Sequence, residues 1–181
     1  MNLEKLIIQH AAPTLANLKT ANLINITFDN LDSFYDEIYK IKNTLEDKCI
    51  NLEILKLKQN SALVYIYRSN LLMKDLRNNI SNSILISTGY KCNTISQYLT
   101  KLSERLLLDD FPHEIGLFLG YPPDDVKAFI DNNGKCAVCC GYWKAYNNVT
   151  TALNTFKKYD MCRKSYLEHF NINKNLNILI V

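Results

Sequence analysis

The chain has 181 residues and a formal net charge of +3, from 21 basic and 18 acidic residues, and 48% of its residues are hydrophobic. These values are ordinary for a globular protein, and the scattered charges imply neither a nucleic acid nor a membrane as partner. No apolar run approaches the roughly 18 residues of a spanning helix, and no signal-peptide pattern opens the chain. We therefore expect a cytoplasmic protein that forms a single domain over residues 1–181.

The N-terminal segment is predicted to contain a helix that begins near residues 10–12. Pro13 supports this start, because proline is best tolerated in the first turn of a helix, where its missing N–H costs nothing. The helix is expected to continue through Leu18. A second helix is predicted over residues 31–45, where Phe34, Ile38, Ile41 and Leu45 have the spacing of one buried face.

Residues 51–58 and 62–68 are predicted to form a β-hairpin, because the second run is rich in strand-forming residues. In the first strand, the period of two places Glu53 on the same face as Leu55 and Leu57. This is the more apolar face of the strand. A carboxylate is therefore expected at a buried position, where it needs a partner.

The remainder of the chain is predicted to be mainly helical, which makes the fold class α+β. We expect helices packed on a small antiparallel sheet. In the long C-terminal helix, Leu153, Phe156, Tyr159 and Met161 are expected to be partly buried. The predicted helices cover residues 70–78, 94–108, 124–132 and 150–170, and short strands are predicted at 83–87 and within 171–181.

Six cysteines are present, and three of them form the cluster Cys136, Cys139 and Cys140. A C-x2-C pair can offer two thiolates to zinc or to an iron–sulfur cluster, and Cys162 with His169 could complete four ligands. The sequence lacks a second C-x2-C pair, and the spacing from Cys162 to His169 is wider than usual for zinc. We expect no metal and no cofactor, and a metal-binding or redox accessory protein is the alternative.

The predicted helix start at Ala11 is a position that suits a cysteine nucleophile. A helix N-terminus favours a thiolate, and its free N–H groups can bind an oxyanion. Papain-like and transglutaminase-like enzymes use this placement, with a histidine and a carboxylate or amide supplied by later segments. Position 11 is alanine in this chain, however, and alanine has no nucleophilic group.

Three segments together resemble a bacterial family of unknown function whose members have about this length and come mainly from anaerobes. The first is QHAAPTLANLK at residues 9–19, the second is FPHEIGLFLGYP at 111–122, and the third is GYWKAY at 141–146, followed by Phe156 and Cys162. In the family pattern, cysteine follows the histidine of the first segment, where this chain has Ala11. Two explanations fit this difference: the chain is a natural inactive relative, or its nucleophilic cysteine has been replaced by design. The second is favoured, because the rest of the family pattern is intact.

The resemblance extends to transglutaminase-like, papain-fold enzymes of closthioamide biosynthesis, which form amides from a carrier-bound acyl chain. It implies acyl transfer from the phosphopantetheine thioester of an acyl carrier protein to a small diamine. A thiolate at position 11 would attack the thioester, and His113 would act as general base and acid. The position of Ala11 is therefore expected to lie near the His113 ring, beside a narrow pocket lined by aromatic or aliphatic side chains.

A carboxylate is expected to hold the imidazole of His113, as in other nucleophile–histidine–acid triads. Glu53 is the first choice, because its face of the strand is apolar. Glu114 is second, since it must bend around its own backbone to reach the neighbouring ring. Asp124 and Asp125 come third, because a helix N-terminus already accounts for them. A non-catalytic binding protein that lacks the nucleophile is the remaining alternative.

Overall fold

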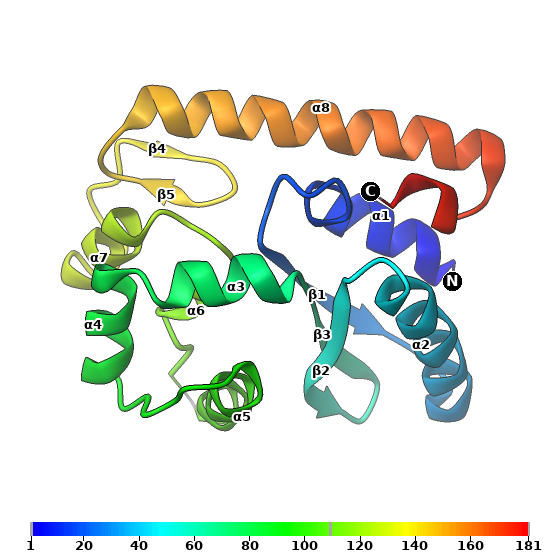
Figure 1. Ribbon diagram of the computed structural model, residues 1–181, viewed down its shortest axis with the longest axis horizontal. Coiled ribbons are helices and arrows are strands. Elements are labelled where there is room, and N and C mark those ends of the chain that lie inside the picture. The colour runs from blue at the N-terminus through cyan, green and yellow to red at the C-terminus, as the bar shows by residue number, and fades with distance from the viewer. Residues whose placement is uncertain (1, 109, 181) are drawn as a thin grey trace. The chain divides into compact units, whose positions relative to one another are not determined.

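The first helix of the computed structural model, which describes residues 2–108 and 110–180, is α1, Leu3–Leu15 (Figure 1). Its N-cap is Asn2, whose side chain accepts a hydrogen bond from the Lys5 N–H at 2.9 Å. The predicted helix start near Ala11 is therefore wrong. Pro13 lies in the last turn of α1 instead of the first, and the helix ends just beyond it.

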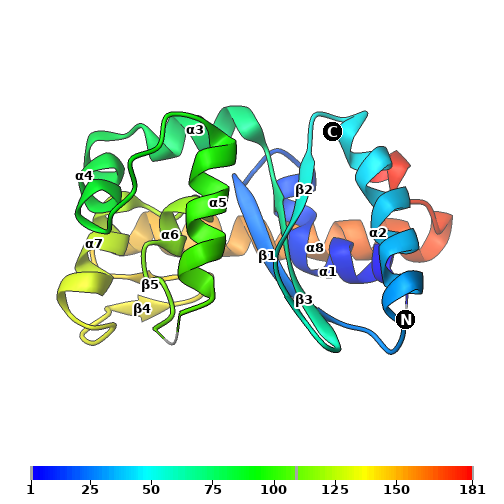
Figure 2. The ribbon, with the colours of Figure 1, turned by 90° about the horizontal axis from the view of Figure 1, so that it is seen from below.

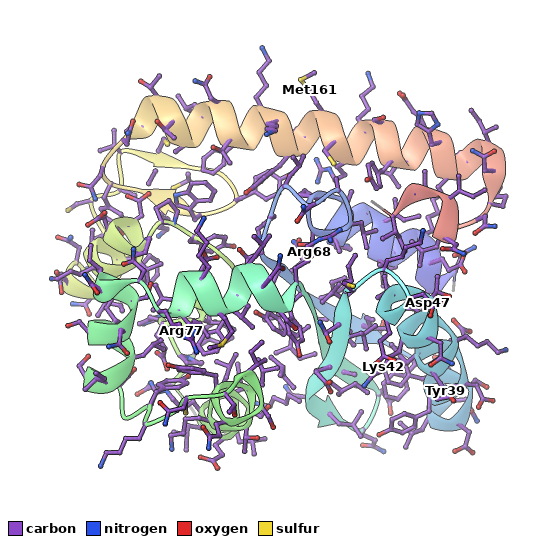
Figure 3. All side chains as sticks on the ribbon, viewed as in Figure 1. Tyr39, Lys42, Asp47, Arg68, Arg77 and Met161 are labelled. Atoms are coloured by element: carbon purple, nitrogen blue, oxygen red, sulfur yellow. The ribbon has the colours of Figure 1, made fainter. Side chains whose placement is uncertain are left out.

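Strong capping explains how α1 ends so soon after its proline. The Arg68 guanidinium, labelled in Figure 3, donates from Nε to the Thr14 carbonyl at 2.8 Å and from Nη2 to the Leu15 carbonyl at 2.9 Å. Asn17 adopts a positive φ of 55°, which turns the chain away from the helix. These bonds satisfy carbonyl groups that have no partner within the helix.

The residues divide into two units, of which the first contains residues 2–69 and 159–180. Its sheet has three antiparallel strands in the order β1 (Ala21–Thr27), β3 (Ser61–Tyr67) and β2 (Asn51–Lys58). The predicted hairpin of β2 and β3 is confirmed, whereas β1 was not predicted. Helix α1 and helix α2 (Leu31–Glu46) lie on the same face of this sheet (Figure 2).

The core of the first unit lies between that sheet face and the two helices. The predicted buried face of α2 is confirmed, because Phe34, Ile38, Ile41 and Leu45 all join this core. The C-terminal tail forms a 3₁₀ turn, Asn177–Leu179, which packs on the same core, so the edge strand predicted there is wrong. Val181, the last residue of that predicted strand, lies outside the described residues.

The face of β2 that carries Glu53 also differs from the prediction. A bulge between Ile54 and Lys56 shifts the register, so the alternation of side chains is interrupted at Leu55. Leu52 and Leu55 are buried, while the Glu53 side chain is 46% exposed and its Oε1 lies 3.5 Å from Lys42 Nζ. Lys42 reaches it from α2 (Figure 3). Glu53 is thus a half-exposed carboxylate with a cationic partner.

The second unit contains residues 70–108 and 110–158 and is mainly helical. Its elements are α3 (Ser69–Leu76), α4 (Asn79–Ser87), α5 (Ile95–Leu106), α6 (Ile115–Phe118), α7 (Pro123–Asp131) and the hairpin of β4 (Cys139–Cys140) and β5 (Lys144–Ala145). The strand predicted at residues 83–87 is wrong, because this run ends α4, whose N-terminus is capped by the Asn78 side chain.

The long helix α8, Val149–Asn173, contains residues of both units. Phe156 and Tyr159 are buried on it, as predicted. Leu153 and Met161 were expected to be partly buried but are 51% and 64% exposed, and Met161 projects from the outer side of the helix in Figure 3. In the described residues, no helix combines the length and apolar character that a membrane span requires.

Candidate functional site

The second unit contains a partly open, strongly apolar cavity of about 350 Å³. Two of the three segments that carry the family resemblance meet here. Residues 111–121 contribute one wall, and residues 140–144 contribute another. The lining comprises Phe111, His113, Ile115, Gly116, Tyr121, Asp125, Val126, Phe129, Cys140, Gly141, Trp143 and Lys144. We call this cavity the aromatic pocket.

The aromatic pocket owes its shape to Asp125, a buried carboxylate in the first turn of α7. Its Oδ2 accepts a hydrogen bond from Trp143 Nε1 at 2.8 Å. Its Oδ1 accepts bonds from the backbone N–H groups of Tyr146 at 3.0 Å and Asn147 at 3.1 Å. The carboxylate therefore ties α7 to the β4–β5 hairpin, and its hydrogen-bonding capacity is committed to structure.

Phe129 forms one wall of the aromatic pocket, and two polar side chains lie against its ring. The His113 ring meets it edge-on, with centroids 5.2 Å apart, and Lys144 Nζ lies 5.6 Å from the ring centroid. The same ammonium group donates a hydrogen bond to the Gly134 carbonyl at 2.7 Å. His113 is exposed, so its imidazole is open to solvent as well as to the pocket.

Close packing at Gly116 forms the inner wall of the aromatic pocket. A Cβ at this position would lie 2.8 Å from Val126 Cγ2 and 3.1 Å from Tyr121 Cδ2, so glycine lets these side chains approach. Burial raises the pKa of the Tyr121 hydroxyl to about 12. Val126 and Tyr121 therefore pack tightly around Gly116 at this wall of the pocket.

The β4–β5 hairpin, which forms one wall of the pocket, packs against Phe156 of α8. At Gly141, a side chain would collide with the Phe156 ring. The Trp143 indole packs edge-on against the same ring, with centroids 4.5 Å apart. Glycine and tryptophan at these two positions therefore let the hairpin lie directly on the helix.

Glu114 is bonded through its carboxylate to Arg105 and Tyr90. It is buried, and its carboxylate forms an ion pair with Arg105, whose Nη2 lies 3.3 Å from Oε2. Tyr90 Oη donates to Oε1 at 3.2 Å, and burial next to Glu114 raises the pKa of the Tyr90 hydroxyl. Both oxygens of Glu114 are thus engaged in a buried network between α5, α6 and Tyr90.

Ala11 lies at the ninth of the thirteen residues of α1 and is fully buried in the core of the first unit. The N–H groups that a helix N-terminus would offer to an oxyanion lie instead at the Leu3 end. The physical reason for expecting an activated thiolate at this position is therefore lost. Ala11 and Glu53 belong to the first unit and His113 to the second, so their predicted proximity stays a prediction.

The side chains of Cys139 and Cys140 point to opposite faces of strand β4, so the cysteine cluster does not face one site. Cys140 lines the aromatic pocket, whereas its neighbour Cys139 packs with Ala145, Ala152 and Phe156 in a small core. Cys136 is exposed in the preceding loop at φ 61°. Across the residues that the structure describes, no three His, Cys, Asp or Glu side chains gather as they would around a metal ion.

The histidine of this site was identified from the sequence, whereas most of its surroundings were not. Asp125 was only a third choice for the carboxylate that orients His113, because a helix N-terminus already accounted for it, and Trp143 was noted only as part of a motif. Their contact spans 18 positions in the sequence, so no local pattern reveals it. The available signal was a pair of acidic residues after two prolines, followed by a segment with the only tryptophan of the chain.

Comparisons with known proteins give one family and no closer relative. Neither a curated protein nor a solved structure matches the chain. The closthioamide link is accordingly unsupported. The model of a family described as protein of unknown function (DUF3793) matches residues 7–180, which is nearly the whole chain. The resemblance seen in the three sequence segments is confirmed, and the chain belongs to this family of proteins of unknown function.

Proposed function

We propose that the aromatic pocket holds the acyl part of a thioester, and that the chain transfers this acyl group to an amine. The observation that carries the proposal is a single apolar cavity lined by both an imidazole, His113, and a thiol, Cys140. Acyl transfer needs an apolar site for the acyl chain and a base close to its carbonyl carbon.

The size of the aromatic pocket selects a small acyl group. A cavity of roughly 150 Å³ holds a benzene molecule, and this one has about 350 Å³. An aryl group or a short aliphatic chain fits that volume, whereas a long fatty acyl chain does not. The rings of Phe129, Tyr121 and Trp143 favour a flat or unbranched ligand.

The polar groups of the pocket suit the carbonyl end of such a ligand. Lys144 supplies a positive charge to a developing oxyanion, and His113 can accept and return a proton. Because the cavity is partly open, the thioester could arrive on the phosphopantetheine arm of an acyl carrier protein. A small diamine would then be the acceptor, which could enter from the same opening.

The papain-like version of the proposal places the nucleophile at position 11. In its favour, α1 packs on an antiparallel sheet, as the nucleophile-bearing helix of that fold class does. Its requirement for a helix that begins at the nucleophile is not met, since α1 begins at Leu3. We therefore keep it as the alternative, and an Ala11→Cys variant tests it.

Trp143 provides a direct test of binding, because it lines the pocket and is the only tryptophan in the chain. The intrinsic fluorescence of the protein should change and saturate when it is titrated with hexanoyl or benzoyl thioesters of N-acetylcysteamine. Acetyl thioester should bind more weakly, since it buries less apolar surface. A fluorescence that is unchanged by all three compounds contradicts the proposal.

A matched pair of variants separates pocket binding from adsorption to the surface. Phe129→Ala removes one pocket wall and should weaken hexanoyl thioester binding by about tenfold, equivalent to about 1.4 kcal/mol. Leu153→Ala removes an exposed apolar side chain from α8 in the same unit, away from the pocket lining, and should leave binding unchanged. Equal losses in both variants would contradict specific binding in the pocket.

A further inference from the structure

We propose that Cys140 is the nucleophile that accepts the acyl group in the aromatic pocket, with His113 as its base. This inference rests on the acyl-transfer function proposed above, and it assigns the reaction to a thiol that the chain possesses. Three structural observations support it: the direction of the Cys140 side chain, the residue opposite it in the hairpin, and the presence of His113 in the same pocket.

The first observation is the direction of the Cys140 side chain. Side chains alternate along a strand, and Cys139 uses the inward direction, where it packs with Phe156 and Ala152. Cys140 takes the opposite direction and is exposed at the pocket wall. Of the three clustered cysteines, Cys140 therefore combines exposure with access to the apolar cavity.

The second observation is the residue opposite Cys140 in the hairpin. Cys140 pairs with Lys144 across the β4–β5 ladder, so the two side chains share one face. The Lys144 ammonium group is held over the Phe129 ring by its bond to Gly134. A fixed positive charge beside the reacting carbon stabilises the oxyanion of a tetrahedral intermediate.

The third observation is that His113 lines the same pocket. His113 and Lys144 both lie against the Phe129 ring, so the imidazole and the ammonium group approach the pocket from two elements. The pocket is about the size of one small ligand, and both Cys140 and His113 line it. Nucleophilic acyl transfer requires a thiol and a base that reach the same bound carbonyl.

The reaction balances with these groups alone. Cys140 Sγ attacks the thioester carbonyl while His113 accepts the thiol proton. The bond from the acyl carbon to Cys140 forms, the bond to the carrier sulfur breaks, and the proton passes from His113 to the leaving thiolate. An amine then attacks the acyl-enzyme, the amide bond forms, and a proton from the nitrogen returns through His113 to Cys140. No oxidant or reductant is needed.

The test is to incubate the wild-type chain with hexanoyl N-acetylcysteamine thioester under reducing conditions and to locate the acyl group by peptide mass spectrometry. One hexanoyl group on Cys140 is expected. Cys136→Ser is the matched control, because Cys136 is an exposed thiol four residues away that does not line the pocket. It should be acylated like the wild type, and Cys140→Ser should not be acylated.

His113→Ala should lower the acylation rate about a hundredfold, and added imidazole should restore part of it, which a merely structural role would not allow. The Trp143 titration separates the two proposals. Binding by Cys140→Ser without acylation supports both. Two results would overturn Cys140 as the nucleophile and leave the proposed binding intact. One is binding by the wild type without acylation of Cys140, and the other is acylation of Cys49 and Cys136 to the same extent as Cys140. A chain that neither binds nor is acylated overturns both.

Discussion

The indole Nε1 of Trp143 donates a hydrogen bond of 2.8 Å to Oδ2 of Asp125, and this bond connects the β4–β5 hairpin to the first turn of α7. One partner is a side chain of the pocket wall, and the other is a buried carboxylate. The geometry of the aromatic pocket therefore depends on a bond between residues that are 18 positions apart in the sequence.

Asp125→Ala should lower the free energy of unfolding of the second unit by about 3 kcal/mol, because Trp143 Nε1 and two backbone N–H groups would lose their acceptor. Urea unfolding followed by Trp143 emission measures this. Asp124→Ala is the control, since Asp124 is the exposed neighbour in the same helical turn. The Asp124→Ala variant should lose less than about 1 kcal/mol of the free energy of unfolding. Equal losses would contradict the anchoring role of Asp125.

Glu114→Gln should destabilise the protein by about 2 kcal/mol, because it removes a buried charge that pairs with Arg105. Glu104→Gln, which disrupts an exposed pair with Lys101, should cost less than about 0.5 kcal/mol. If Glu114 oriented His113, the variant would also change the pH dependence of acylation. We expect that dependence to be unchanged once the folded fractions are matched.

Much of the fold follows from local patterns in the sequence, and the exceptions have physical causes. The buried face of α2 was predicted from the helical spacing of its apolar residues. The β2–β3 hairpin was predicted from the strand-forming residues in its second strand. The start of α1 was missed because Pro13 is accommodated in the last turn, where Arg68 satisfies the terminal carbonyls from 53 and 54 positions away. Among the pocket residues, His113 was predicted as the base and Asp125 only as a third choice of orienting carboxylate, because the contacts that build the pocket are tertiary.

The Gly116→Ala variant should close the aromatic pocket, because the new methyl group would displace Val126 and Tyr121. Thioester affinity should fall at least about tenfold, with a stability cost of about 1–3 kcal/mol. The double variant Gly116→Ala/Val126→Ala should regain part of the affinity, since it restores space. Gly89→Ala is the control: Gly89 has φ 87° and an open environment, so its substitution strains the backbone without affecting the pocket.

Stability should fall as the pH rises from about 10 to about 12. The pKa of Tyr121 is raised to about 12 by burial, so the unfolded state loses the phenolic proton at a lower pH than the folded state does. The unfolded state then binds fewer protons, which favours unfolding across that window. Tyr121→Phe should reduce the decline in the urea midpoint, and Tyr67 and Tyr166, whose pKa values burial also raises to about 12, contribute to what remains. Tyr39→Phe, at a side chain 68% exposed, should leave the decline unchanged.

An Ala11→Cys variant should fold normally and hide its new thiol, because position 11 is fully buried and cysteine packs as a small apolar residue. Peptide mapping after a brief pulse of a thiol reagent should show Cys140 labelled and position 11 unlabelled until urea is added. Rapid acylation at position 11 by a thioester in the native state would instead favour the papain-like alternative.

The central claim is that an acyl thioester binds in the aromatic pocket, and the Trp143 indole N–H signal tests it most directly. In a two-dimensional ¹⁵N NMR spectrum this single tryptophan gives one indole resonance, which reports on the bond to Asp125. Titration with hexanoyl N-acetylcysteamine thioester should shift this signal and the amide signals of Gly116 and Val126, saturably and together. Shifts confined to residues 2–69, with these three signals unmoved, would contradict the account.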